Sequence, residues 1–280
     1  MNKNPRWPKS APLVVLALAL MHCLVPQGSG AEGCDQLRLA LRPSEPALPL
    51  GAPVLAALEI VNEGALPASL DLGKNFKGNL RLVFDLPDGR TVAARPYNAP
   101  PDGAFVPGVV VVKAGGSHTQ QLVLNEWQAF TAAGTYRVAL RIEQSPESCT
   151  RGPLSTAAVI EMTTPDEPRL RQVCNRLAAD AKSLNATAKA AAEGLSYASD
   201  EACLAALIEV LKGDSRSRSW ALKGLARIGT KDAAAAVARE WRRFDEFDRG
   251  EALMAFISNG KGDELRAAVA NMEPKQPKPP

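Results

Sequence analysis

The sequence predicts a two-domain protein in which an antiparallel β-sandwich is followed by an α-helical repeat domain. Before residue 163, hydrophobic residues alternate with polar ones, whereas after residue 168 they recur every three or four residues. Short motifs in the second part also repeat at a spacing of 31 residues. The change of period falls in residues 163–168, where we predict a short linker. In a chain of 280 residues, each part is long enough to bury its own core.

Residues 1–31 have the features of a secretory signal peptide. Basic residues near the start precede an apolar run from Ala11 to Val25, which is shorter than a membrane-spanning helix. Small residues then lead to Ala31, where we expect cleavage. We therefore predict export to the periplasm or the extracellular space. Membrane attachment would require that the signal stays uncleaved, which is the alternative.

The charge of the chain depends on this signal. The sequence has 33 Lys and Arg residues against 30 Asp and Glu residues, and three of the basic residues lie within residues 1–31. The exported chain would then carry 30 residues of each sign. Nucleic-acid binding requires a basic face, so we predict no nucleic-acid partner.

Four cysteines lie outside the signal: Cys34, Cys149, Cys174 and Cys203. An even number of cysteines in an exported chain indicates disulfides, and four cysteines allow three pairings. The boundary between the domains favours Cys34–Cys149 in the first domain and Cys174–Cys203 in the second. Free buried thiols are the alternative. A disulfide that crossed the boundary would contradict the two-domain assignment.

Residues 35–162 are predicted to form the β-sandwich. Large apolar residues alternate along residues 80–86, and Asp88-Gly89 then predicts a hairpin turn into a second strand. Another clear strand begins at Tyr136. Weaker strands are expected at residues 37–41, 54–61, 68–72, 109–112, 120–124 and 157–162. Many short strands without a long helix are typical of an antiparallel sandwich.

One segment of this domain resembles a known family. The sequence GTYRV at residues 134–138, preceded by LNEW at 124–127 and AA at 132–133, is similar to the closing strands of bacterial immunoglobulin-like domains. The resemblance implies a buried tyrosine corner, in which the hydroxyl of Tyr136 bonds to nearby backbone. It implies a fold and no particular activity.

Residues 169–272 are predicted to form about seven helices. Asp166 and Pro168 suit the start of the first helix, Asp as its cap and Pro in its first turn. Helix corners near residues 197–202, 228–233 and 259–264 align at a spacing of 31 residues. Gly229 and Gly260 can each end a helix in left-handed geometry, and Ser199 and Thr230 can cap the helix that follows.

The best-matching copy of this repeat covers residues 221–236, with ALKGLARIG before the corner and Asp232-Ala233 after it. This pattern resembles HEAT-like repeats, which implies helix pairs stacked into a solenoid with a common core. An irregular bundle of helical hairpins is the alternative. Residues 273–280 (EPKQPKPP) lack apolar content and are predicted to form a disordered tail.

Three aromatic sites are candidates for binding. The loop at residues 95–107 carries two aromatic residues among four prolines, and residues 241–248 (WRRFDEFD) are the densest aromatic and charged stretch of the helical part. The third is a tryptophan in the connection before residue 136. The alternative for residues 95–107 is an ordinary connecting loop. For residues 241–248 it is an inter-repeat core, and for the tryptophan it is a loop pinned onto the sandwich. The candidate residues are Tyr97, Phe105, Trp127, Trp241, Arg242, Phe244 and Phe247.

The sequence predicts no catalytic, cofactor-binding or metal-binding residue. His118 is the one histidine outside the signal, and neither C-x-x-C nor G-x-S-x-G occurs. We therefore expect a non-enzymatic exported protein that binds another protein or acts as a scaffold in the bacterial periplasm or cell envelope. One alternative is a cell-wall or carbohydrate binding module that uses Tyr97, Phe105 and Trp127. Another is a carboxylate-dependent hydrolase, which would need two acids ~5–10 Å apart in an open cleft.

Overall fold

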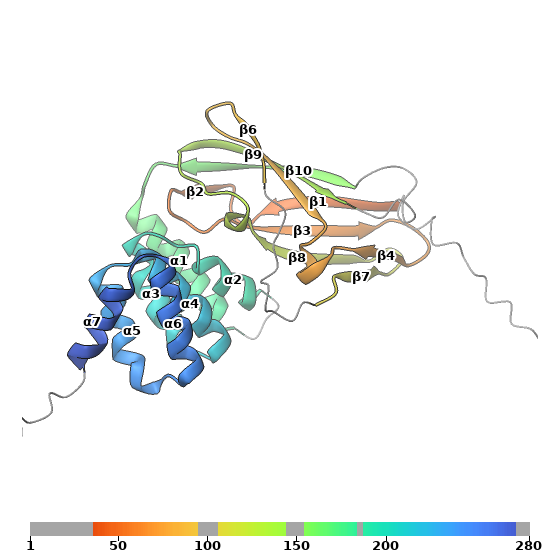
Figure 1. Ribbon diagram of the computed structural model, residues 1–280. Coiled ribbons are helices and arrows are strands. Elements are labelled where there is room, and N and C mark those ends of the chain that lie inside the picture. Colours follow the sequence, from red (N-terminus) through yellow and green to blue (C-terminus); the bar gives the residue numbers. More distant parts are fainter. Residues whose placement is uncertain (1–35, 95–105, 144–153, 184–186, 273–280) are drawn as a thin grey trace, which may run out of the picture.

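The computed structural model describes residues 36–94, 106–143, 154–183 and 187–272. A β-region at residues 37–163 is followed by a helical region at residues 167–272, so the predicted order of β and α parts is confirmed (Figure 1). The predictions that lie outside the described residues are those for residues 1–31 and 273–280, and for Cys34, Tyr97, Phe105 and Cys149.

The β-region consists of short strands in three sheets. The sheet orders are β1-β3-β8, β2-β10-β9-β5-β6 and β4-β7, and every pairing is antiparallel except that of β2 with β10. Figure 1 shows the sheet of β9 and β10 above that of β1, β3 and β8. The strands are β1 (Leu37–Pro43), β2 (Ala47–Pro49), β3 (Leu55–Asn62), β4 (Ala68–Asp71), β5 (Leu80–Asp85), β6 (Thr91–Ala93), β7 (Val109–Val112), β8 (Ser117–Val123), β9 (Gly134–Ile142) and β10 (Ser155–Thr163).

Period-two patterning explains these strands. Every second residue of β9 is buried, from Tyr136 to Ile142, and the residues between them are exposed. Gly89 has a φ of 83°, which permits the predicted turn between β5 and β6. The predicted contact of Tyr136 is also confirmed, because its hydroxyl donates to the Ala132 carbonyl at 3.1 Å. Strand β2 was not predicted, since it is only three residues long and lies among prolines.

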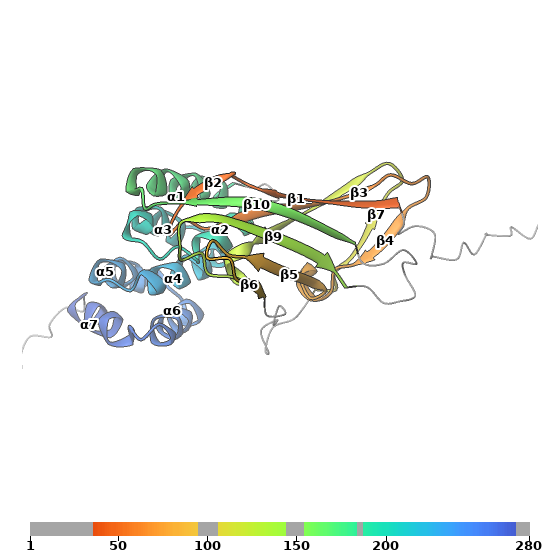
Figure 2. The same ribbon diagram turned by 90° about the horizontal axis from the view of Figure 1, so that it is seen from above.

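The helices of the second region pack in two rows. Helices α2, α4 and α6 contact one another in succession, and α1, α3, α5 and α7 do the same in the other row (Figure 2). The helices are α1 (Glu167–Ala181), α2 (Ala188–Leu195), α3 (Leu204–Leu211), α4 (Ser215–Ile228), α5 (Lys231–Glu240), α6 (Glu246–Ser258) and α7 (Gly262–Met272), with short 3-10 turns η4 (Glu201–Cys203) and η5 (Trp241–Arg243).

Local sequence fixes most of the helix ends. Asp166 caps α1 by accepting a hydrogen bond from the Arg169 amide at 3.0 Å, as predicted. Gly229 and Gly260 have φ values of 64° and 71°, which confirms left-handed geometry at both corners. The prediction for Ser199 is wrong, because the neighbouring Asp200 is the residue whose side chain accepts from a backbone amide, that of Ala202 at 2.8 Å.

A disulfide joins Cys174 of α1 to Cys203 of η4, with Cα atoms 5.4 Å apart. This is the pairing predicted for the second domain. Both residues are fully buried on the apolar sides of their helices. The bond therefore fixes the first helix of the region to the start of α3.

The two regions share one contiguous cluster of buried hydrophobic residues. Helix α2 approaches β3 so closely that a Cβ atom added at Gly194 would lie 2.7 Å from Leu55 Cδ1. The nearly buried carboxylate of Glu45, before β2, pairs with both Arg169 and Arg176 of α1. These contacts place the helical region directly against one end of the sheets (Figure 1).

Candidate functional site

A hollow at the end of the helical region farthest from the sheets is the strongest candidate for a binding site. It has a volume of about 370 Å³ and lies where α5, η5, the start of α6 and the end of α7 meet. We refer to it as the terminal pocket. Its lining residues are Ala238, Arg239, Trp241, Arg242, Arg249, Val269 and Met272.

Three arginines dominate the charge of the terminal pocket. Arg242 donates to the Met272 carbonyl at 3.3 Å, and Arg249 Nε donates to the Trp241 carbonyl at 3.2 Å. Such bonds satisfy carbonyl groups at the C-terminal ends of helices. Within the described part of the chain, neither these two arginines nor Arg239 pairs with a carboxylate, and all three are exposed. The pocket therefore presents uncompensated positive charge.

The remaining wall of the pocket is apolar. Trp241 is half-buried there, and Val269 and Met272 complete the surface from α7. A hollow that combines an indole, aliphatic side chains and guanidinium groups can bind an apolar group and a neighbouring anion together. Trp and Arg are also the residues most enriched among energetically important interface positions.

The four candidate residues within 241–248 have different environments in the structure. Trp241 and Arg242 line the terminal pocket, whereas Phe244 is buried beside Arg218 of α4, its ring centroid 6.2 Å from that of Trp241. Phe244 therefore follows the alternative of an inter-repeat core. Phe247 is 68% exposed and lies on the outer face of α6. Met254 and Ile257, which are 63% and 46% exposed, extend this apolar stripe at helical spacing.

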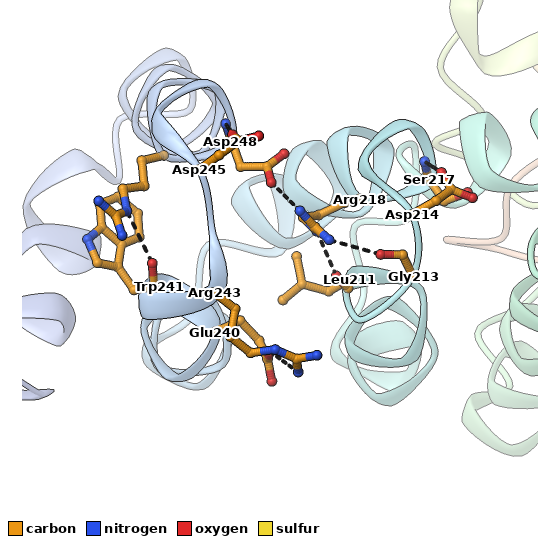
Figure 3. A network of polar contacts seen from close by, with 11 residues as sticks. Leu211, Gly213, Asp214, Ser217, Arg218, Glu240, Trp241, Arg243, Asp245 and Asp248 are labelled. Atoms are coloured by element: carbon orange, nitrogen blue, oxygen red, sulfur yellow. Dashed lines mark hydrogen bonds and ion pairs between the residues drawn. The ribbon is translucent and has the colours of Figure 1, made fainter.

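A buried ion pair beside this site joins α4 to α6 (Figure 3). Arg218 of α4 pairs with Asp248 of α6, whose side chain is 1% exposed. Arg218 also donates to the carbonyls of Leu211 at 3.3 Å and Gly213 at 3.0 Å, and its guanidinium carbon lies 5.5 Å from the Phe244 ring centroid. Sequence reasoning missed this pair, because Arg218 and Asp248 lie 30 residues apart and outside the helix corners that the repeat spacing aligned.

A second buried cluster lies at the junction of the two regions. The Lys77 ammonium contacts Glu126 at 2.7 Å and Glu193 of α2 at 2.9 Å, and all three side chains are nearly buried. Burial raises the pKa of Glu126 to about 7, because a neutral acid is less costly to enclose than a carboxylate. Burial opposes the charge of Lys77, but the two carboxylates raise its pKa overall. Burial also acts to raise the pKa of Glu193, yet hydrogen bonds and the Lys77 charge leave it lowered.

Trp127 belongs to this junction and is not a surface residue. Its side chain is 9% exposed, and its ring centroid lies 5.8 Å from Lys77 Nζ. The prediction that Trp127 contributes to an exposed aromatic patch is therefore wrong. The structure agrees with the alternative, in which the connection before residue 136 is a loop packed onto the sandwich. Tyr97 and Phe105, the other members of that predicted patch, lie outside the described residues.

The described ranges hold neither a cluster of metal-ligating side chains nor a membrane-spanning helix. No group of three or more His, Cys, Asp and Glu side chains there could hold a metal ion. None of the helices described is long and apolar enough to cross a membrane. His118 lies on β8, paired with Ile60 of β3 in the sheet, and burial lowers its pKa.

Comparisons with known proteins show no family for this chain. No protein-family model and no curated protein matches it. Solved structures that it partly resembles include the alkylpurine DNA glycosylase AlkC of Pseudomonas fluorescens (10% identity, TM-score 0.26) and a red sea bream transglutaminase (17%, 0.30). The sporulation control protein Spo0M of Bacillus subtilis gives 11% and 0.30. These matches cover 46%, 47% and 52% of this chain and 30%, 17% and 54% of the respective proteins.

Proposed function

We propose that this chain is a non-enzymatic exported protein whose helical end binds another protein. In this proposal an immunoglobulin-like β-domain and a HEAT-like helical array form one rigid support. The observation that carries the proposal is the terminal pocket, where Trp241 lies among three arginines that have no carboxylate partner in the described structure.

The arrangement of the helices supports a HEAT-like array. Two rows of helices contact their neighbours in succession, and the corners recur at a spacing of 31 residues. In such arrays each helix pair covers the face of the previous pair, so the last pair has an uncovered face unless a polar cap follows. Here the last described pair exposes Phe247, Met254 and Ile257, which are not capping residues.

The composition of this end supports a protein partner. Interface cores are enriched in aromatic residues, Met and Arg and depleted in acidic residues and Lys. The outer face of α6 supplies Phe247 and Met254, and the terminal pocket supplies Trp241 and its arginines. An apolar surface bordered by charge is a frequent mark of an interaction site.

The contacts at the junction support a structural role for the buried acids Glu126 and Glu193. A hydrolase would need Glu126 and Glu193 free to act on a substrate, but both carboxylates contact the Lys77 ammonium. Their pairing links η3 (Leu124–Glu126), which follows β8, to α2 and holds the two regions in a fixed orientation. We therefore favour a scaffold role for this cluster over catalysis.

The disulfide supports export. Structural disulfides persist mainly in oxidising compartments such as the periplasm, and Cys174–Cys203 is fully enclosed. Together with the signal-like sequence of residues 1–31, this favours a location outside the cytoplasm.

Site-specific crosslinking in cells tests the proposal. A photoreactive amino acid at Met254 should give a discrete adduct with another protein in the exported fraction. The matched control carries the same group at Val159, an exposed apolar residue on β10. Equal adduct patterns at the two positions, or no adduct at Met254, would contradict binding through the helical end. Recovery of the chain only from the cytoplasm would contradict export.

A further inference from the structure

The terminal pocket has an internal counterpart one helix pair earlier. Helices α4 and α6 are capped by Asp214 and Asp245, which are 31 residues apart, and each aspartate accepts from a backbone amide three residues later. Gly229 and Gly260 keep the same spacing at the other end. In this register Arg218 corresponds to Arg249.

The two arginines make the same kind of backbone contact. Arg218 Nε donates to the Leu211 carbonyl at the end of α3, and Arg249 Nε donates to the Trp241 carbonyl just after α5. Each arginine thus satisfies the end of the preceding helix. The remaining guanidinium N–H groups of the two arginines have different surroundings.

At the inner position, the next helix pair completes the site. Asp248 pairs with the Arg218 guanidinium (Figure 3). The Phe244 ring centroid lies 5.5 Å from the Arg218 guanidinium carbon and 6.2 Å from the Trp241 ring centroid. The next pair therefore supplies an aromatic ring and, four residues later, a carboxylate. Both groups are buried by this contact.

At the outer position, the residues with the same spacing do not supply these groups. The residues 31 positions after Phe244 and Asp248 are Lys275 and Pro279, which are neither aromatic nor acidic. Arg249 lines the terminal pocket instead, and Trp241 and Met272 form its wall. Arg239 and Arg242 add two more cations, so the pocket disfavours a basic occupant.

We infer that the terminal pocket binds an acidic, aromatic segment of a partner protein, which repeats in trans the contact that Phe244 and Asp248 make in cis. The inference rests on the proposed function and names the chemistry of the partner. The partner's aromatic side chain fills the hollow beside Trp241. Its carboxylate, about one helical turn later, pairs with Arg249, and further acidic residues meet Arg239 and Arg242.

A peptide from the protein itself provides the probe. The synthetic peptide FDEFDRGEALMAFIS, residues 244–258, carries the ring and the carboxylate in their native spacing. Titration of the full chain with this labelled peptide, followed by fluorescence anisotropy, should give saturable binding of one peptide per chain. A peptide with Asn in place of Asp248 should bind about tenfold more weakly, because it loses a charge-assisted bond.

A double-mutant cycle links the peptide to the pocket. Arg249→Gln in the protein should weaken binding of the native peptide about tenfold and should leave binding of the Asn peptide almost unchanged. Arg239→Gln changes a second lining residue and should also weaken binding of the native peptide, because acidic residues of the peptide meet Arg239. Circular dichroism and thermal unfolding confirm that each variant is folded. If the losses of binding caused by Arg249→Gln and by the Asn peptide simply add, the two groups do not interact and the inference is overturned.

Other occupants would give different results. Polyphosphate that displaces the peptide, together with equal binding of the Asp and Asn peptides, would overturn the inference in favour of a general anion site. Concentration-dependent self-association of the chain that Arg249→Gln abolishes would overturn it in favour of a second copy. If the peptide fails to bind while Met254 still forms its adduct, the proposed function stands and this inference fails.

Discussion

The junction of the two regions and the free end of the helical region use similar side chains in opposite ways. At the junction, a lysine, two glutamates and a tryptophan are nearly buried and contact one another. At the free end, arginines and a tryptophan surround a hollow without a described carboxylate partner. Burial makes an ionic cluster costly to break but adds little recognition, whereas exposure makes it cheap to alter and available to a partner. This contrast separates positions of stability from positions of binding.

Lys77→Met should give the largest loss of stability. It leaves two nearly buried carboxylates without their cation, and breaking a buried ion pair in this way costs about 3–5 kcal/mol. Urea unfolding of the full chain measures the change. The triple variant Lys77→Met, Glu126→Gln, Glu193→Gln is the control, because it removes the charges together and should recover part of the loss. An unchanged unfolding midpoint for Lys77→Met would show that the ion pairs of Lys77 with Glu126 and Glu193 are not buried at the junction.

Equivalent arginines should respond differently to the same change. Arg218→Gln leaves the buried Asp248 carboxylate without its cation and should cost about 3 kcal/mol. Arg249→Gln, at the corresponding exposed position, should cost less than about 0.5 kcal/mol. Hydrogen exchange of α6 amides reports the difference locally, because Asp248, the partner of Arg218, lies in α6. Similar losses at both positions would remove the distinction between the inner and outer sites.

The junction should also make stability depend on pH. The pKa of Glu126 is raised from 4.5 to about 7, so the folded protein binds this proton more tightly than the unfolded chain. Its contribution is fully present below pH 4.5 and is lost as the pH rises through 7, by up to about 3 kcal/mol. Glu193, whose pKa is lowered, acts in the opposite direction and only below about pH 4.5.

Unfolding free energies measured from pH 5 to pH 8 check this dependence. The groups that face Glu126 are Lys77 and Glu193, and Lys189 acts on Glu193 by its charge. Glu126→Gln is the matched variant and should flatten the decline between pH 5 and pH 8. A wild-type curve that rises with pH over this range would contradict the raised pKa.

Local patterns predicted the elements of this protein better than its polar clusters. Alternation at residues 80–86 and the capping aspartate at residue 166 act over a few residues, so they can be recognised without the fold. Lys77 meets Glu126 and Glu193 across 49 and 116 residues, and no local signal marks that contact. The same limit explains Trp127, which looks like a surface aromatic in the sequence but is 9% exposed in the structure, with Lys77 Nζ 5.8 Å from its ring centroid.

The terminal pocket was only half predictable. Trp241 and Arg242 were found because they are adjacent in an aromatic and basic stretch. Arg239 and Arg249 were missed, although Arg249 lies 31 residues after Arg218 and shares its place in the repeat. The repeat spacing therefore contained more information than the corners for which it was used. Phe244 and Phe247 are three residues apart, yet the first is buried and the second is 68% exposed, a difference that depends on tertiary packing.

The smallest expected effect tests the free end directly. Phe247→Ala should change the unfolding free energy by less than about 0.5 kcal/mol, because the ring is 68% exposed and its removal opens no cavity. Phe256→Ala on the same helix is the control, since that ring is fully buried and its loss should cost about 3–5 kcal/mol. If Phe247→Ala also abolishes the adduct formed at Met254, the exposed ring acts in binding alone. A stability loss at Phe247 that matched the loss at Phe256 would mean that another part of the chain covers this face, and the free end would then resemble the junction.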